Sequence, residues 1–259
     1  MALTEKFTQN NYYIMNEENL INEQLDIQQI KEEFQKEKFV IVRNFLKEEE
    51  AEKLHSYYDT IPENWWSWMF LPDPDLGIDS WATSVYPDDG SASLKKLISN
   101  KRHFLDSVYR ENRGFSYIYK RVFFGNHFPK CLCEECVFRK SFLEVSPMVN
   151  FLQEISQHKD LRPGELFTSK YGKGDYNGPH NDHCKGRVTI VLNLSKGWLP
   201  QDGGLFFSMK EDYVTITRAE APTFNSLVIF DVPDGGLPHL VSHVTHPSKK
   251  RIAVTGWYE

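Results

Sequence analysis

The chain has 259 residues, of which 40% are hydrophobic and 14% aromatic, and its formal net charge is −6. These values fit one large globular domain and exclude wholesale disorder. An acidic chain has no general attraction to phosphate backbones or anionic lipids, so we expect neither nucleic acid nor a membrane as a partner. Its apolar runs are too short to span a bilayer, and its four cysteines are too few for a disulfide scaffold. We therefore expect a reduced, cytoplasmic protein.

The N-terminal part predicts helices around one buried strand. Residues 1–25 are polar and predict a loosely held lead-in. Residues 26–37 place apolar side chains on one helical face, and FVIVRNF (39–45) predicts a buried strand. Residues 47–61 predict a second helix with acidic side chains in its first turn, where the helix dipole favours them. We expect residues 26–160 to pack on the core that follows.

Residues 62–140 predict an insertion, and we expect it to determine substrate choice. It begins with a tryptophan-rich, irregular loop, and residues 92–120 predict a broken helix. The segment HFPKCLCEEC then brings together the four soft ligands His127, Cys131, Cys133 and Cys136. Such ligands build structural zinc sites, but the C-x-C spacing is less usual and no second knuckle follows. A zinc site and free thiols in a loop both remain open.

Helical periodicity stops near residue 158, and short segments rich in β-branched and aromatic residues follow. Turn-forming Gly, Pro, Asp and Asn separate them. The predicted strands are 164–172, 186–195, 203–209, 212–218, 225–232, 239–244 and 250–259. Short strands of this kind predict a jelly roll, so the fold class is α+β and mainly β. We expect the jelly-roll core at residues 161–259, flanked by the N-terminal helices in one cooperative unit.

The sharpest local feature is GPHNDH, in which His180 and Asp182 are two residues apart. On an extended segment both side chains point to the same face, where an imidazole and a carboxylate can bind one metal ion. The alternative is a hydrogen-bonded turn, which Asp and Asn after Gly-Pro often form. A facial triad needs one more histidine from a distant strand. The candidates are His239, His243 and His246.

Arg251 begins the last predicted strand and supplies a second chemical constraint. Alternation along the strand places Arg251, Ala253, Thr255 and Trp257 on one face. An arginine on an otherwise apolar strand needs an anionic partner. A dicarboxylate held on a metal at its other end would supply that anion.

The successive segments YGKGDYNGPHNDH, RVTIVLNLS, DGGLFF, HLVSHV and KKRIAVTGW resemble the iron- and 2-oxoglutarate-dependent oxygenases of the prolyl-hydroxylase group. The resemblance covers roughly residues 160–259, and FVIVRNFLKEEEAEKL is similar to that family's first strand and helix. H-x-D occurs often by chance, whereas the ordered set of five elements is specific.

This resemblance implies a double-stranded β-helix in which His180, Asp182 and His239 bind Fe(II). His239 is preferred to His243 because its spacing to the following valines and to Arg251 matches the family pattern. Arg251 would hold the distal carboxylate of 2-oxoglutarate through a bidentate pair.

Further roles carry over by position from the same resemblance. Asn193 stands where relatives often place a tyrosine for the distal carboxylate, which leaves its role open, and Thr189 on the same face would share that task. Tyr171 stands where relatives place a tyrosine that contacts the co-substrate. Tyr176 and Trp257 would line the substrate side.

The resemblance further implies Fe(II), 2-oxoglutarate as co-substrate and O2, with ascorbate as a reductant. The reaction would hydroxylate an amino-acid side chain, either a prolyl residue of a protein or a free amino acid or small metabolite, and release succinate and CO2. Related halogenases replace the carboxylate ligand by Gly or Ala, so Asp182 favours hydroxylation. The motifs do not indicate the oligomeric state.

Two other readings of the sequence remain. One is a cupin-like metal enzyme that does not use 2-oxoglutarate, and the other is an inactive jelly-roll binding module. Arg251 argues against the first, and the intact triad together with Arg251 argues against the second.

Overall fold

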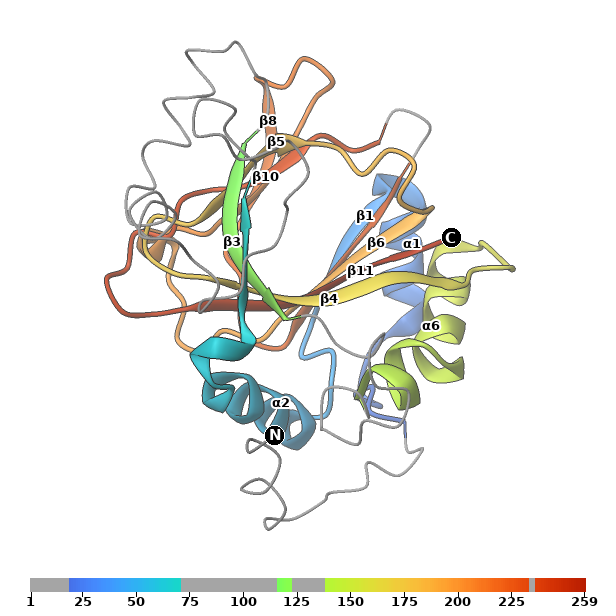
Figure 1. Cartoon of the computed structure of the whole chain (residues 1–259). Helices are drawn as coiled ribbons and strands as arrows, with labels where there is room; N and C mark the ends of the chain where they lie inside the picture. Colours follow the sequence, from blue (N-terminus) through green and yellow to red (C-terminus); the bar gives the residue numbers. More distant parts are fainter. Residues whose placement is uncertain (1–18, 71–115, 123–137, 233–235) are drawn as a thin grey trace.

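The computed structural model describes residues 19–70, 116–122, 138–232 and 236–259. This described part is mostly a curled antiparallel β-sheet with a few helices packed on it (Figure 1). The helices are α1 (Ile27–Glu37), α2 (Glu48–Thr60) and α6 (Ser146–Ser156), with a π-helical turn at Arg139–Leu143. The predicted zinc ligands His127, Cys131, Cys133 and Cys136 lie outside the described residues, and so does most of the predicted insertion.

Local signals define the first helix. The Asp26 carboxylate accepts a hydrogen bond of 2.9 Å from the Gln29 backbone N–H, and so caps the N-terminus of α1. The helix ends at Lys38, whose φ of 55° is left-handed. Phe34 is fully buried and fixes the helix face that meets the sheet.

The described strands come from both the N-terminal and the C-terminal part of the chain. They are β1 (Phe39–Arg43), β2 (Ser67–Phe70), β3 (Tyr117–Val122), β4 (Pro163–Tyr171), β5 (Tyr176–His180), β6 (Val188–Asn193), β7 (Phe206–Met209), β8 (Ile216–Glu220), β9 (Ser226–Asp231), β10 (His239–Val241) and β11 (Arg251–Tyr258). The order across the sheet is β1-β9-β6-β11-β4-β3-β5-β10-β7-β8, and β2 pairs with β3. The curled sheet agrees with the predicted, mainly β, jelly-roll-like class.

One wall of the curl consists of β1, β9, β6, β11 and β4, and α1 and α6 cover its outer face (Figure 1). On β6, Ile190 and Leu192 join the core cluster that contains the buried residues of these helices. Thr189 and Val191 alternate with them and line a cavity inside the curl. This wall therefore separates an apolar core from an interior face that can carry polar chemistry.

The other wall contains β3, β5, β10, β7 and β8. Strand β3 joins the walls, since it pairs with both β4 and β5. Strand β10 lies antiparallel to β5, with His239 opposite His180. Two segments far apart in the sequence are thereby placed side by side at the open interior of the curl.

The structure confirms all seven strands predicted after residue 158, although β8 begins at Ile216 rather than at residue 212. The predicted helix at 92–120 is wrong at its described end, where Tyr117–Val122 form β3. Four of the six side chains of YIYKRV are buried and two are partly buried, and pairing with β2, β4 and β5 satisfies its backbone. Because β1, β2 and β3 join the same sheet as the later strands, the sheet crosses the predicted division at residue 160.

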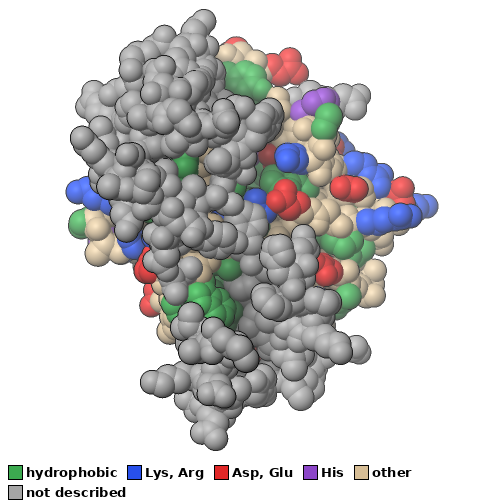
Figure 2. All heavy atoms as spheres, viewed as in Figure 1, with side chains coloured by type: hydrophobic (Ala, Val, Ile, Leu, Met, Phe, Trp, Pro, Cys, Tyr) green, Lys and Arg blue, Asp and Glu red, His purple; other side chains and the backbone are tan. Residues whose placement is uncertain are grey.

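The described surface mixes charges of both signs. Acidic and basic side chains are interspersed on the face shown in Figure 2. Among the described residues, the helices are too short or too polar to cross a bilayer.

Asn225 provides a test of how the N-terminal segment is fixed to the sheet. Its buried side chain accepts from the Leu46 N–H at 2.9 Å and donates to the Leu46 carbonyl at 2.8 Å. We expect Asn225→Ala to lower the free energy of unfolding by about 2–4 kcal/mol, because both backbone groups lose their partner. Chemical denaturation measures this loss.

Asn225→Gly separates the loss of these hydrogen bonds from the backbone strain that alanine would add at this position. Asn225 has a φ of 54°, which glycine adopts without strain. The glycine variant loses the same hydrogen bonds but should be about 1 kcal/mol more stable than the alanine variant. A loss below about 1 kcal/mol in both variants would contradict the role assigned to this side chain.

Candidate active site

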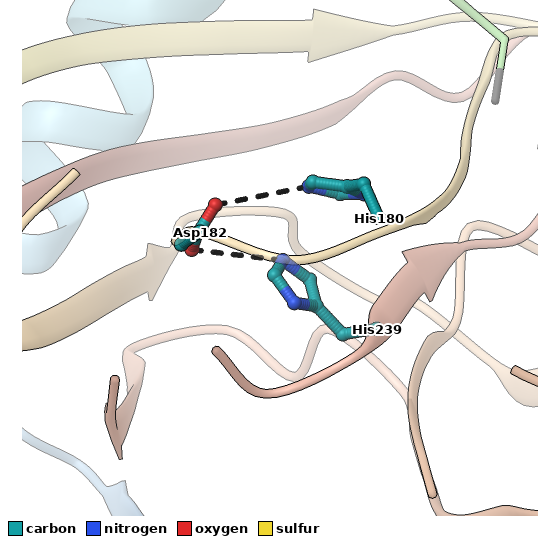
Figure 3. Close-up of side chains that lie close together, drawn as sticks. All are labelled: His180, Asp182 and His239. Atoms are coloured by element: carbon teal, nitrogen blue, oxygen red, sulfur yellow. Dashed lines mark ion pairs between the residues drawn. The ribbon is translucent and has the colours of Figure 1, made fainter. Parts of the chain in front are cut away.

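Two histidines and one aspartate meet at the interior end of β5 and β10. His180 is the last residue of β5, Asp182 follows it in the loop, and His239 is the first residue of β10. The distance from His180 Nε2 to Asp182 Oδ1 is 3.9 Å, and that from His239 Nε2 to Asp182 Oδ2 is 3.8 Å (Figure 3). One ligand atom from each residue lies within 4.8 Å of the others. This spacing is compatible with a single shared metal ion.

Backbone carbonyls set the tautomer of both imidazoles. His180 Nδ1 lies 2.8 Å from the Gly178 carbonyl oxygen, and His239 Nδ1 lies 2.7 Å from that of Leu237. A carbonyl oxygen only accepts, so each Nδ1 carries the proton and donates it. Each Nε2 therefore presents its lone pair toward Asp182, as metal-ligating histidines with a hydrogen-bonded outer nitrogen do (Figure 3).

Burial prepares the donor set for a cation. Asp182 is 4% exposed and His239 7% exposed. Burial and the neighbouring His239 lower the pKa of His180 to about 4, and Asp182 offsets this only in part. His180 is therefore neutral at pH 7 and available as a ligand. Thr189 Oγ1 donates to Asp182 Oδ2 at 3.0 Å and fixes the carboxylate.

Two imidazoles and one carboxylate form the donor set of a non-haem Fe(II) facial triad. Removing a carboxylate from water without a counter-charge is costly, and a divalent cation among these three atoms would supply that charge. The residues present therefore fit an iron ion. Among the described residues, only this group of three His, Cys, Asp or Glu side chains has such spacing.

The triad opens into a cavity of about 790 Å3. Arg251 lines this cavity and is itself 3% exposed. Its Nη2 donates to the Asn193 amide oxygen at 3.4 Å, and its Nε is buried with no hydrogen-bond partner among the described residues. Burial lowers the pKa of Arg251. The acceptor of this buried guanidinium among the described residues is a neutral amide. A carboxylate that enters the cavity would supply the anionic partner that a buried guanidinium needs.

Aromatic side chains close this end of the cavity around Arg251. Its guanidinium carbon lies 5.2 Å from the centre of the Tyr171 ring, and Tyr171 stacks on Tyr119 at 4.9 Å. Burial raises the pKa of Tyr171 to about 12, so its hydroxyl stays protonated and can donate to an anion.

The structure brings most of the predicted site residues together. Tyr171, Thr189 and Trp257 line the cavity with the triad and Arg251, and Asn193 reaches it through Arg251. The hydroxyl of Thr189 bonds to Asp182, while its predicted role with the co-substrate stays a prediction.

Tyr176 is placed differently from the predicted substrate side. Its ring lies 4.3 Å from that of His243, and its hydroxyl bonds to Ser116. The next residue of β5, Asn177, lines the cavity instead, because neighbouring side chains of a strand face opposite sides. His246 accepts hydrogen bonds from the backbone of its own turn, with no contact to the triad among the described ones.

Sequence reasoning missed the contribution of β3. Tyr117, Tyr119 and Arg121 line the cavity, and the mistaken helix concealed them. YIYKR shows no apolar/polar alternation that would have marked them, because this strand depends on pairing with β2, β4 and β5. Lys185 and Glu165 also line the cavity, and nothing in the sequence pattern marks them.

Fold and site together fit a metal-dependent enzyme with a buried arginine in the same cavity. Residues 166–259 match a family model described as the 2OG-Fe(II) oxygenase superfamily. The matched segment contains all three metal-ligand candidates and Arg251. The matched segment is that of a 2-oxoglutarate-dependent dioxygenase, and this family implies Fe(II), 2-oxoglutarate and O2.

Solved structures share the fold at low sequence identity. One is an oxidoreductase of the 2OG-Fe(II) oxygenase family from Burkholderia pseudomallei, with 12% identity, a TM-score of 0.55 and coverage of 92% of each chain. Another is a prolyl hydroxylase from Trichoplax adhaerens in complex with a peptide fragment of a hypoxia inducible factor oxygen degradation domain. It has 16% identity and a TM-score of 0.56, over 90% of this chain and 88% of that one. No curated protein matches the sequence.

Thr189→Val tests the support of the carboxylate ligand. Valine has a similar shape, but it cannot donate to Asp182. Loss of such a supporting contact should weaken Mn(II) or Fe(II) binding about 10- to 100-fold. Calorimetric titration of the metal measures this, with Thr189→Ser as the matched control that retains the hydroxyl. Equal affinity in all three proteins would contradict the role of Thr189.

The choice between the two histidines of the β10 region gives a second test. We expect His239→Ala to abolish specific binding of a divalent metal, because one of three ligands is lost. His243→Ala should leave metal binding within about threefold of wild type, since His243 packs on Tyr176 instead. The reverse outcome, measured by the same titration, would show that the triad is assigned to the wrong histidine.

Proposed function

We propose that the protein hydroxylates an amino-acid side chain, of a prolyl residue in a protein or of a free amino acid or small metabolite, with release of succinate and CO2. One observation carries this proposal: the triad and Arg251 line one cavity. The fold neighbour from Trichoplax adhaerens is described with a bound peptide, which makes peptides one substrate class to test. We also propose that the curled sheet is a double-stranded β-helix.

Iron and 2-oxoglutarate, when bound, supply the O2-dependent oxidation. His180, Asp182 and His239 would hold the iron on one side, so its remaining positions face the cavity. Arg251 would bind the distal carboxylate of 2-oxoglutarate and orient it. Tyr119 and Tyr171 exclude water from that end through their stacked rings.

Phe167 and Trp257 also line the cavity, and their ring centres are 5.5 Å apart, so they form an apolar wall. The aliphatic part of a prime substrate would lie against them. Protein residues thus position the co-substrate and substrate, and they keep competing water away from the metal.

Arg251 distinguishes this proposal from a cupin-like enzyme that does not use 2-oxoglutarate. Such an enzyme needs the metal ligands but no buried guanidinium in the same cavity. An inactive binding module would need neither a metal-ready triad nor neutral imidazoles aimed at one carboxylate. Both alternatives leave the burial of Arg251 without a compensating anion.

Anaerobic addition of Fe(II) and then 2-oxoglutarate tests the proposal directly. We expect a weak visible charge-transfer band that requires both additions. Exposure to O2 should then release succinate. His239→Ala is the matched control and should show neither signal. Metal binding without a 2-oxoglutarate-dependent band would favour the cupin-like alternative.

Arg251→Lys tests the recognition of the co-substrate. Lysine keeps the charge but loses the planar fork, which should cost on the order of 2–4 kcal/mol of binding free energy. The KM for 2-oxoglutarate should therefore rise roughly 30- to 1000-fold. Succinate release against 2-oxoglutarate concentration measures this change.

Arg251→Ala should raise that KM further, because the carboxylate would be buried without a cation. The affinity for Fe(II) without co-substrate should change little in both variants, since Arg251 is not a ligand. An unchanged KM in Arg251→Ala would remove Arg251 from the co-substrate site.

A further inference from the structure

We propose that the cavity selects a prime substrate that carries a carboxylate, and that Arg121 on β3 is the residue that recognises this group, with Lys185 in support. This inference rests on the proposed function, since it names the substrate class of the same site.

Arg121 is a second buried arginine in the cavity, separate from Arg251. It is paired with Ser169 in the register of β3 and β4, whereas Arg251 is paired with Tyr171, two residues farther along β4. At the rise of a strand, this separation is about 7 Å of backbone. A small dicarboxylate held between the metal and Arg251 therefore does not account for Arg121 as a lining residue of the same cavity.

Its neighbours hold the guanidinium of Arg121 in a defined orientation. The guanidinium carbon lies 3.6 Å from the centre of the Phe167 ring, and Nη2 donates to the Glu165 carboxylate. The Arg121 side chain is 9% exposed, while that of Glu165 is 47% exposed. Both residues line the cavity, and the guanidinium is the more buried member of the pair. A desolvated charge attracts an anion more strongly than an exposed one.

Lys185 supplies a second cation close to the aromatic lining residues. Its Nζ lies 5.5 Å from the centre of the Trp257 ring, and the rings of Trp257 and Phe167 are 5.5 Å apart. Arg121, Phe167, Trp257 and Lys185 thus form a row of cation, ring, ring and cation, which we call the cationic-aromatic row. The indole N–H of Trp257 is buried without a hydrogen-bond partner among the described residues, and so adds an unused donor to this row.

The charges of the cavity lining favour the same substrate class. Asp182 is assigned to the metal and Arg251 to the co-substrate. The other charged lining residues are Arg121, Lys185 and Glu165, two cations and one anion. Among the described lining residues without another assigned role, cations therefore outnumber anions, in a chain whose net charge is −6. An apolar body flanked by a carboxylate matches the cationic-aromatic row in shape and in charge.

The carboxylate has two possible sources, the α-carboxylate of a free amino acid or an acidic side chain in a peptide. Two probe pairs separate them. L-leucine against L-leucinamide tests the free carboxylate, and the capped peptides acetyl-Glu-Pro-Glu-amide and acetyl-Gln-Pro-Gln-amide test the side chain. Each is titrated calorimetrically into the full chain loaded with Mn(II) and 2-oxoglutarate.

In wild type, we expect the acidic member of one pair to bind about 10- to 100-fold more tightly than its amide, as for a charge-assisted hydrogen-bonded pair. Arg121→Gln should abolish this ratio. Lys185→Gln should reduce the ratio about two- to fivefold, as for an exposed charge. Lys159→Gln, an exposed lysine in the turn between α6 and β4, is the matched control and should keep the ratio.

Glu165→Gln covers the case in which Arg121→Gln does not fold. Removing the competing carboxylate should increase the preference for the acidic probe, whereas a purely structural ion pair predicts no increase. The proposal is overturned if wild type binds both members of each pair equally or binds none. It is also overturned if Arg121→Gln keeps the ratio, or if Glu165→Gln does not increase it.

The titration of 2-oxoglutarate in the same experiment keeps the two proposals distinct. If 2-oxoglutarate does not bind to the Mn(II) protein, the proposed function fails. If it binds while the acidic preference is absent, only the role of Arg121 fails.

Discussion

The register between β10 and β5 is the constraint on which the site depends. It sets His239 opposite His180, although the two residues are separated by 59 positions in the sequence. A shift of one residue would turn His239 to the other face of the sheet, away from His180 and Asp182. Strand β10 lies between β5 and β7 and pairs with both, which fixes this register. The opposite wall, whose outer face α1 and α6 cover, carries Thr189, and the hydroxyl of Thr189 reaches Asp182.

Hydrogen bonds from neighbouring groups orient the polar side chains in the interior of the curl. Carbonyl oxygens fix the imidazole protons, and Thr189 fixes the carboxylate, so the ligand atoms converge before a metal arrives. Arg251 is buried against the neutral Asn193 side chain, which leaves its charge for an external anion. Burial of these polar groups lowers the stability of the fold. Binding of the metal and the co-substrate at these groups would offset that cost.

Much of this arrangement could be predicted from the sequence. β-Branched and aromatic segments between turn residues located seven of the eight described strands after residue 158, all except β5. The spacing of His180 and Asp182 indicated a metal site. The prediction failed for the N-terminal part of the sheet. YIYKRV forms a strand because β4 and β5 offer it partners, and such long-range pairing has no local signature. Arg121 was missed with that strand. The role of Tyr176 was carried over by position from the resemblance, whereas its neighbour Asn177 is the residue that lines the cavity.

The central claim is that one cavity holds both the metal on His180, Asp182 and His239 and the co-substrate on Arg251. The most direct measurement is a crystal structure with Mn(II) and N-oxalylglycine, an unreactive analogue of 2-oxoglutarate. We predict an anomalous scattering peak bonded to the three side chains, with the distal carboxylate of the analogue on the Arg251 guanidinium. A metal bound elsewhere in the chain, or an analogue that does not contact Arg251, would contradict the account.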